Sequence, residues 1–427
     1  MTMMTERLEI LQKSVREHLE HGIIPFWLAR AKDAQYGGYL TNFDEQGQAQ
    51  EMPEKYLNTQ CRLLWWFSQM HRKYPSIPGS ADMARWGIDF MLKYFWDEQY
   101  GGFYWKVKRD GSFCDDAKIV YGESFAIYAL SEYTLATGDP RGLEYASKTF
   151  DLLQKYCADT RFGGYYENVL RDWSVEEAGF AGGDRKGLDT HMHLMESFTT
   201  LYEASQAPIH RRKLLQIIDL IANRMVDPVT NCGLNQFDVA FNPIPAIAIK
   251  RTWNAERMGE TPAQPTETTS YGHNLELVWL MQRALTIANA DFTPYLPLMQ
   301  KLLNHGVTHG VDWEYGGIYR DGLRDGGPLV LEKEFWQHSE SLVGFLAGYE
   351  LFNDPRYVDA FEALWNFVHK YMIIENVGEW RTLLDRTGQP IDPNIGNPWK
   401  VSYHTGRAMM ESKERLTRLL AREEATV

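Results

Sequence analysis

Tyr36-Gly-Gly-Tyr39 is the first of six related glycine segments, and their repetition decides the fold. The later ones are Tyr100-Gly-Gly-Phe-Tyr104, Phe162-Gly-Gly-Tyr-Tyr166, Asn231-Cys-Gly-Leu234, Tyr315-Gly-Gly-Ile-Tyr319 and the weaker Val377-Gly-Glu-Trp380. Counted from Gly37 to Gly378, successive segments are 64, 62, 70, 83 and 62 residues apart. Self-similarity at regular steps indicates a chain built from repeated supersecondary units.

The stretches between the glycine segments have helical periodicity. Apolar side chains recur at the spacing of one helix face in the stretches 63–70, 125–132 and 194–202. A second helix begins at Asp139-Pro140 and at Asp354-Pro355, where Asp caps the helix and Pro takes its first position. Short polar turns such as Lys108-Arg-Asp-Gly111 predict a small hairpin. Each unit is therefore expected to hold two helices and one hairpin.

Six such units predict twelve helices, and a closed ring buries all of them without the polar end caps that a linear array needs. We therefore expect an all-α chain that forms an (α/α)6 barrel of six inner and six outer helices, with short glycine-rich hairpin loops. No Pro/Ser-rich linker divides the sequence, so residues 1–427 are expected to be one catalytic domain. The segment Pro262–Pro265 is expected to be a loop inside a unit.

Composition narrows the class of protein. Hydrophobic residues make up 44% and charged residues 24%, the balance of a soluble globular chain. No run of about 18 apolar residues is present, so no membrane span is expected. A net charge of -13 argues against a nucleic-acid partner. With charged residues near the start and four scattered cysteines, we expect a cytoplasmic monomer or homodimer with buried thiols.

Polar side chains recur at similar distances after the glycine segments, near the predicted start of each buried inner helix. They are Arg62, Glu123, His193, His273, His338, Glu340 and His404. Equivalent positions on six inner helices converge at one end of a barrel axis, so we expect a shared pocket there. His273 and Glu276 are three residues apart on one helix face, where a carboxylate can hold an imidazole in one tautomer. Histidine suits acid–base catalysis near neutral pH, and an arginine can stabilise an enediolate oxygen.

A metal site is the competing interpretation of these histidines. His191-Met-His193 is an H-x-H pair, but residues two apart on a helix do not share a face. The sequence has no H-E-x-x-H motif, no Cys/His ligand spacing and no phosphate-binding glycine loop. We therefore expect neither a metal nor another cofactor.

Three longer motifs carry a resemblance to a known family. They are His273-Asn-Leu-Glu276, Phe335-Trp-Gln-His-Ser-Glu340 and Trp399-Lys-Val-Ser-Tyr-His404-Thr-Gly-Arg407. In this order they resemble the acylglucosamine 2-epimerase superfamily, and its cellobiose and mannose 2-epimerase branch is the nearest. The resemblance runs from about residue 6 to residue 415. It implies an (α/α)6 barrel that inverts C2 of a reducing sugar without a metal or nucleotide.

The resemblance also implies roles for the polar residues. His404 matches the base that removes the C2 proton, and His273 matches the partner that helps open the sugar ring and returns a proton. Arg62 matches the arginine beside the carbonyl and C2 oxygens. Glu276 and Glu340 match the carboxylates that orient the two bases.

Substrate binding is implied for a second group of residues. His193 matches a third histidine, which binds the open-chain sugar, and the aromatic lining matches Tyr121, Trp336 and Trp399. Asp189 stands where cellobiose epimerases usually carry Asn. The run from Lys55 to Arg62, with Gln60 two residues before the arginine, is more similar to the acylglucosamine epimerases. These departures favour a small-molecule monosaccharide substrate, with D-mannose and D-glucose interconverted, over a β-1,4-disaccharide such as cellobiose.

Three alternatives remain open. An aldose–ketose isomerase of the mannose/fructose type removes the same C2 proton but protonates C1. A glycoside hydrolase on an (α/α)6 barrel would use two carboxylates such as Glu276 and Glu340, and would leave three histidines without a role. A sugar- or protein-binding module would need only the aromatic side chains.

Overall fold

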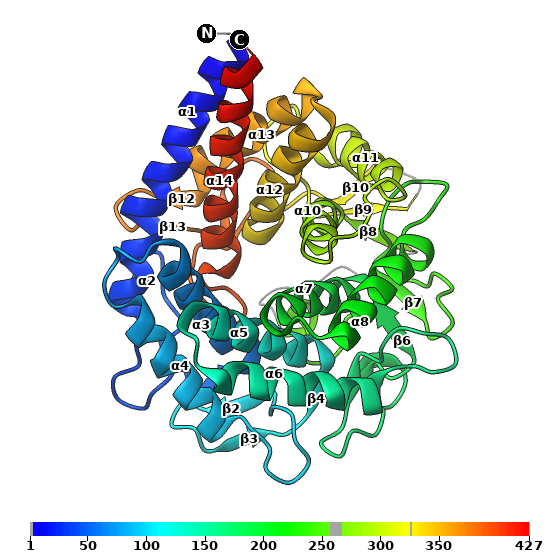
Figure 1. The fold of residues 1–427 in the computed structure, drawn as a ribbon. Helices are drawn as coiled ribbons and strands as arrows, with labels where there is room; N and C mark the ends of the chain where they lie inside the picture. The colour runs from blue at the N-terminus through cyan, green and yellow to red at the C-terminus, as the bar shows by residue number, and fades with distance from the viewer. Residues whose placement is uncertain (1–2, 257–266, 325–326, 427) are drawn as a thin grey trace.

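Two sets of helices, one inside the other, form the protein (Figure 1). The computed structural model describes residues 3–256, 267–324 and 327–426. The inner helices are α3 (Leu57–Lys73), α5 (Val120–Thr137), α7 (Leu188–Ser205), α10 (Tyr271–Ile287), α12 (Phe335–Phe352) and α14 (Ser402–Thr426). Each packs against the next, and α14 returns to pack against α3, so the ring closes.

The outer helices cover this ring from outside. They are α1 (Met3–His18), α4 (Ser80–Tyr94), α6 (Pro140–Leu152), α8 (Pro208–Leu220), α11 (Leu296–His305) and α13 (Pro355–Phe367). Short helices α2 (Ile24–Arg30) and α9 (Trp253–Glu256) lie outside this pattern. Outer helix α1 packs against inner helix α14, which places the two ends of the chain side by side (Figure 1). The expected (α/α)6 barrel is confirmed.

The burial pattern follows from position in the two rings. Inner helix α5 is buried on all sides through most of its length because it contacts both neighbours and an outer helix. Outer helices such as α6 bury one face only. The predicted caps are confirmed, since the carboxylates of Asp139 and Asp354 accept hydrogen bonds from the backbone N–H of Arg141 and Arg356.

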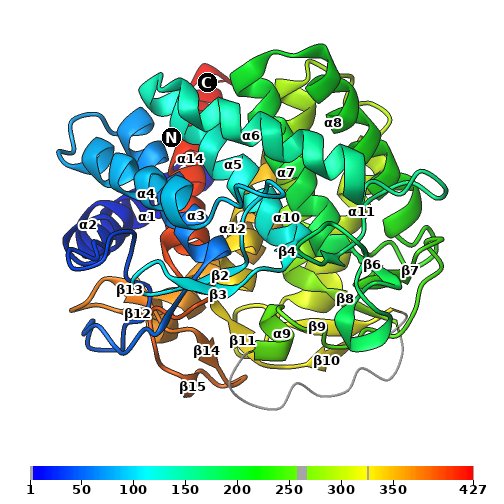
Figure 2. The same ribbon diagram turned by 90° about the horizontal axis from the view of Figure 1, so that it is seen from below.

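Short antiparallel strands gather at one end of the barrel (Figure 2). A strand before an inner helix pairs with the hairpin of the following unit. The sheets are β1 (Glu54–Tyr56) with β2 (Lys106–Lys108) and β3 (Phe113–Asp115); β4 (Lys118–Ile119) with β5 (Asn168–Val169); β6 (Arg185–Gly187) with β7 (Gln236–Asp238); β8 (Thr268–Ser270) with β9 (Asp321–Leu323) and β10 (Pro328–Val330); β11 (Lys333–Glu334) with β14 (Leu383–Leu384) and β15 (Pro390–Asp392); and β12 (Ile373–Ile374) with β13 (Glu379–Trp380).

Buried ion pairs reinforce these sheets. Asp33, four residues before Gly37, binds Lys55 of β1 at 2.9 Å and Arg109 of the next hairpin at 3.0 Å. Equivalent aspartate–lysine pairs are Asp97–Lys118, Asp159–Lys186 and Asp312–Lys333. Each pair joins two consecutive units. Its aspartate precedes the glycine segment of one unit, and its lysine lies on the strand that pairs with the hairpin of the next unit. The sequence analysis did not identify this repeat.

Several expectations have other outcomes. Pro262–Pro265 lies outside the described residues. Cys61, Cys157 and Cys232 are buried as expected, but Cys114 is half-buried and its thiol donates to Glu54. No helix in the described ranges is long and apolar enough to cross a membrane. The assignment of residues 1–427 to one domain stays a prediction, which the closed ring favours.

Candidate functional site

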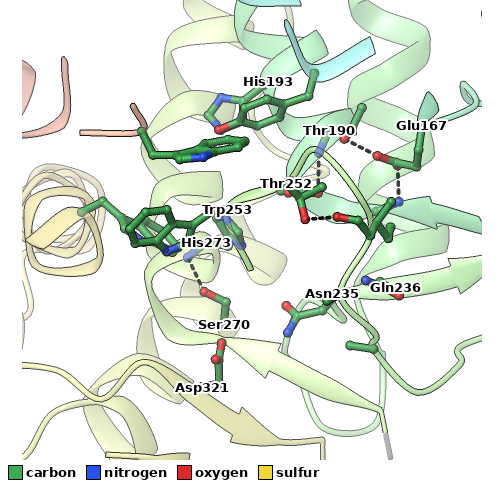
Figure 3. A pocket seen from close by; sticks show the side chains of 18 of the residues that line it. Glu167, Thr190, His193, Asn235, Gln236, Thr252, Trp253, Ser270, His273 and Asp321 are labelled. Atoms are coloured by element: carbon green, nitrogen blue, oxygen red, sulfur yellow. Dashed lines mark hydrogen bonds between the residues drawn. The ribbon is translucent and has the colours of Figure 1, made fainter. Parts of the chain in front are cut away.

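A cavity of about 410 Å³ lies where the inner helices begin, at the hairpin end of the barrel. Among the described residues, its wall includes nine of the ten residues proposed from the sequence for catalysis or sugar binding: Arg62, Tyr121, Asp189, His193, His273, Glu276, Trp336, Trp399 and His404. The tenth, Glu340, lies behind His404. Figure 3 shows His193 of α7 and His273 of α10 at this cavity, together with Trp253, the first residue of α9, and Thr252 just before it.

His404 has a carboxylate partner. Its Nδ1 lies 2.6 Å from Oε1 of Glu340, and Trp279 donates to the other oxygen of this carboxylate at 3.1 Å. Burial and the positive charges of Arg62 and Arg407 hold the pKa of His404 well below its usual range. The imidazole is therefore neutral at pH 7, and its second nitrogen remains for the cavity. This is the arrangement of a base with a carboxylate that stabilises its protonated form.

His193 is paired in the same way, which the sequence analysis did not foresee. Its Nδ1 lies 2.9 Å from Oε2 of Glu196, three residues later on α7. Burial raises the pKa of Glu196, but the charge of Arg407 and the hydrogen bonds from His193 and Tyr403 lower it to about 2. The spacing of His193 and Glu196 equals that of His273 and Glu276, so the sequence did contain a signal for this pair.

His273 differs from the other two. No hydrogen bond joins it to Glu276 within the described part of the chain, although the sequence spacing suggested one. Its ring packs against Trp336, with ring centroids 4.6 Å apart, and Trp336 also lies 6.0 Å from the ring of His404. Burial and the nearby His193 lower the pKa of His273 to about 3. Trp336 therefore lies beside two neutral histidines, His273 and His404, and of these two His404 is the one bound to a carboxylate, that of Glu340.

Arg62 is held by hydrogen bonds along the cavity wall. One Nη donates to the backbone oxygen of Trp399 and the other to the hydroxyl of Tyr121, both at 2.7 Å. Its Nε is buried and has no hydrogen-bond partner among the described residues. The guanidinium is thus fixed in place as a donor beside the histidines, and Tyr121 is positioned with it.

Glu123 and His338 do not face the cavity as the repeat phase suggested. They belong to a set of inner-helix side chains that accept the backbone N–H of a hairpin residue at 2.8 to 3.1 Å. The set consists of Gln60, Glu123, His191, Asn274 and His338, which accept from Tyr39, Phe103, Tyr165, Gly233 and Ile318. We call these the hairpin-binding positions. They anchor the hairpins to the inner helices.

The second glycine of the Gly-Gly pair is required by this anchor. Gly164 and Gly317 have φ of +72° and +74°. A Cβ on either would lie 2.6 or 2.5 Å from Nε2 of His191 or His338. The second glycine therefore recurs because the hairpin-binding side chain occupies the space that a Cβ would take.

The residue two places after a hairpin-binding position points toward the barrel axis. We call these residues the axial positions; they are Arg62, Phe125, His193, Glu276 and Glu340. Arg62 lies over the ring of Phe125 at 4.5 Å, and Phe125 packs on His193 with centroids 4.9 Å apart, as expected near a common axis. His191 and His193 thus point in different directions, as the H-x-H spacing predicts.

Glu167 is a wall residue that the sequence analysis missed. It precedes β5, and its two oxygens accept hydrogen bonds from the backbone N–H of Gly187 and the hydroxyl of Thr190, both at 2.5 Å. Thr190 also donates its backbone N–H to Asp189 at 2.7 Å. Burial and the nearby Asp189 raise the pKa of Glu167 to about 8. The cavity wall beside His193 therefore carries two carboxyl groups, those of Glu167 and Asp189.

Glu276, Glu340 and His404 form the one group in the described residues whose ligand atoms lie close enough for a shared metal ion, within 4.8 Å of one another. Both carboxylates, however, are bound by the guanidinium of Arg407, at 2.7 and 2.8 Å. A cation at this point would be repelled by Arg407, so the cluster fits an ion-pair network better than a metal centre.

A family model described as "N-acylglucosamine 2-epimerase (GlcNAc 2-epimerase)" matches residues 38–408. The chain belongs to the N-acylglucosamine 2-epimerase family. The match begins inside the first glycine segment, at Gly38, and spans the other five segments and the cavity residues described above. This family membership makes the chain a carbohydrate 2-epimerase or isomerase, and thus an enzyme.

Individual relatives agree over nearly the whole length. A cellobiose 2-epimerase of Bacteroides fragilis is 26% identical over 409 residues, which cover 94% of this chain and 98% of the relative. A D-mannose isomerase of Marinomonas mediterranea is 25% identical over 390 residues, 89% of this chain and 92% of the relative. The solved structure of cellobiose 2-epimerase from Bacillus thermoamylovorans superposes with a TM-score of 0.84 at 27% identity, covering 95% of this chain and 100% of that one.

Proposed function

We propose that this enzyme inverts C2 of a free reducing aldose, with D-mannose and D-glucose as the leading pair. The observation that carries the proposal is the asymmetric pair of histidines against Trp336. His404 has Glu340 on its Nδ1, whereas His273 has no such partner in the described residues. An epimerase needs a base for one face of C2 and a proton donor for the other.

Ring opening comes first, because the C2 proton is acidic only when C1 is an aldehyde. In this proposal, the free nitrogen of neutral His404 then takes the C2 proton. Glu340 stabilises the imidazolium that forms. The product of this step is a cis-enediolate, whose negative charge lies on the C1 and C2 oxygens.

Arg62 supports the enediolate in this scheme. Its guanidinium is already fixed by Trp399 and Tyr121, so it needs no reorganisation when charge develops on the sugar. The negative charge of the enediolate favours protonation of His273, which takes up a proton from solvent and, as an imidazolium, gives it to the other face of C2, while His404 releases to solvent the proton that it took. Both histidines then exchange protons with solvent, so a product formed in D2O carries deuterium at C2.

The remaining wall residues bind the sugar. His193, held by Glu196, is assigned to the open-chain hydroxyls, and Trp336 and Trp399 to the apolar faces of the sugar. Asp189 supplies a carboxylate beside His193. No step in this proposal uses a metal or another cofactor.

The second candidate is an aldose–ketose isomerase, such as one that converts mannose to fructose. The similarity to the D-mannose isomerase of Marinomonas mediterranea over 89% of this chain favours it. Its base removes the same C2 proton, but the proton returns to C1. The two reactions differ in where the second proton donor reaches the enediolate.

Proton NMR of the purified protein with D-mannose in D2O separates these reactions. D-glucose with deuterium at C2 is the expected product. Fructose would replace the epimerase by the isomerase. A parallel run with cellobiose tests the substrate, since conversion of cellobiose without conversion of mannose would overturn the monosaccharide assignment.

A further inference from the structure

Arg407 joins three glutamates from three inner helices, one of which lines the cavity. It is 2% exposed and contacts Glu196 of α7, Glu276 of α10 at 2.7 Å and Glu340 of α12 at 2.8 Å. All three carboxylates are buried, and Glu276 also lines the cavity. Three buried acids thus share one guanidinium, so their combined charge is not balanced if all three are ionised.

The three carboxylates differ in the donors around them. Glu196 accepts from His193, Tyr403 and Arg407. Glu340 has a matching set in His404, Trp279 and Arg407. Each therefore has three donors, as a buried carboxylate requires.

Glu276 has one donor in the described part of the chain, Arg407 on its Oε1. Its Oε2 is buried and has no hydrogen-bond partner there. A bare carboxylate oxygen in such a place is costly, whereas a protonated oxygen is a donor that a bound sugar can satisfy.

We propose that Glu276 stands in the cavity wall as a neutral carboxylic acid that donates a hydrogen bond from Oε2 to a sugar oxygen. Glu196 and Glu340 remain ionised as the partners of His193 and His404. The inference rests on the proposed function for the identity of the acceptor, an oxygen at C1 or C2. Glu276 keeps its proton throughout and is not a base.

The charges around Glu276 agree with this assignment. Burial and the neighbouring Glu340 and Glu196 raise its pKa well above the usual range, against the opposing charge of Arg407. The titratable groups that interact with it come from α5, α7, α12 and α14: Tyr121, Glu196, Glu340, Tyr403, His404 and Arg407. Burial raises the pKa of Glu340 as well, but its three donors favour the ionised form there, so the proton belongs on Glu276.

Infrared difference spectroscopy tests the protonation state without any turnover. The spectrum of the wild-type protein minus that of Glu276→Gln at pH 7 should show the carbonyl stretch of a protonated carboxyl group. The antisymmetric stretch of an ionised carboxylate in its place would overturn the proposal. Glutamine copies the shape of a neutral glutamic acid, so the variant is expected to fold.

Activity separates Glu276 from its ionised neighbour. Glu276→Gln should keep kcat within about tenfold of the wild type, because the amide still donates a hydrogen bond, whereas Glu276→Leu should lose about 10² to 10³ in kcat. The matched control is Glu340→Gln on the adjacent helix, which removes the partner of His404. It should lose about 10² to 10⁴. Equal losses in Glu276→Gln and Glu340→Gln would contradict a neutral Glu276.

The two proposals fail in different ways. If no aldose exchanges its C2 proton with solvent, the proposed function is wrong, and the infrared spectrum still decides whether Glu276 is protonated. If exchange occurs but the spectrum shows an ionised Glu276, the epimerase assignment stands and this inference fails.

Discussion

Two groups of histidines in this barrel have opposite surroundings, and on α7 a member of each group, His191 and His193, lies only two residues from the other. The hairpin histidines, His191 and His338, have both ring nitrogens bound by backbone groups. The pocket histidines, His193, His273 and His404, line the cavity. A histidine with both nitrogens bound has one fixed tautomer and no lone pair for a substrate, so residue type alone does not indicate catalysis.

The strongest test of this comparison replaces one histidine of each group by glutamine. His404→Gln should lose about 10³-fold in kcat because the base is gone, with little change in stability. His338→Gln should keep turnover, because Gln60 already serves as the acceptor in the first unit. C2 deuterium exchange with D-mannose, together with thermal unfolding, measures both. Full activity in His404→Gln would remove the distinction.

For the free energy of unfolding, the hairpin histidine His338 should matter more than the pocket histidine His404. His338→Leu leaves the N–H of Ile318 without its acceptor, so it should lower the free energy of unfolding by about 2 to 4 kcal/mol. His338→Gln should cost less because it keeps an acceptor. Urea unfolding of the two variants and the wild type checks this. An equal loss in both would mean that the ring's packing, and not the hydrogen bond, anchors the hairpin.

The hairpin histidines also predict how stability depends on pH. Burial lowers the pKa of His338 from 6.5 to about 3 and that of His191 to about 4. Since the unfolded chain binds more protons than the folded one between these values, stability is present above pH 6.5 and is lost as pH falls. At pH 5 each histidine should cost about 2 kcal/mol relative to pH 7.

His338→Gln should therefore show a smaller loss of stability between pH 7 and pH 5 than the wild type does. Denaturant unfolding at the two pH values measures the difference. An unchanged loss would mean that His338 is not neutral by burial in the folded protein.

The smallest effect on catalysis is expected at Trp399, an aromatic residue of the cavity wall. Trp399→Ala should raise KM about tenfold with little change in kcat, because Arg62 is held by the backbone oxygen of Trp399 and not by its ring. Trp399→Phe, which keeps an aromatic face, is the control. Initial rates over a range of D-mannose concentrations measure both constants. A fall in kcat alone would mean that the ring orients Arg62 or His404.

The sequence was sufficient for the architecture because each unit repeats its own local signals. Gly-Gly pairs, Asp-Pro caps and helical spacing are fixed by local geometry, and the structure has them where the repeat placed them. The aspartate–lysine pairs, such as Asp33–Lys55, were not found because the partners lie about 20 residues apart and look like ordinary surface charges.

The site was predicted less completely, for a geometric reason. Loops of different length separate the glycine segments from the inner helices, so the repeat phase could not distinguish a hairpin-binding position from an axial position two residues later. Glu123 and His338 were therefore grouped with Arg62 and His193. The partners of Arg407 could not be predicted either, since they come from three helices that meet only in the closed ring.

The two-residue interleaving along the inner helices has a consequence for how such an enzyme can change. Side chains that hold the hairpins and side chains that face the axis alternate on the same helix turn and have different hydrogen-bond partners, as His191, bound to backbone groups, and His193, bound to Glu196, show. A substitution at an axial position such as Phe125 can thus alter the pocket while its neighbour Glu123 keeps the hairpin in place. New substrate preferences can therefore arise by substitutions at Phe125, the axial position of α5, while the hairpins stay anchored, whereas the other axial positions are tied to the proposed chemistry.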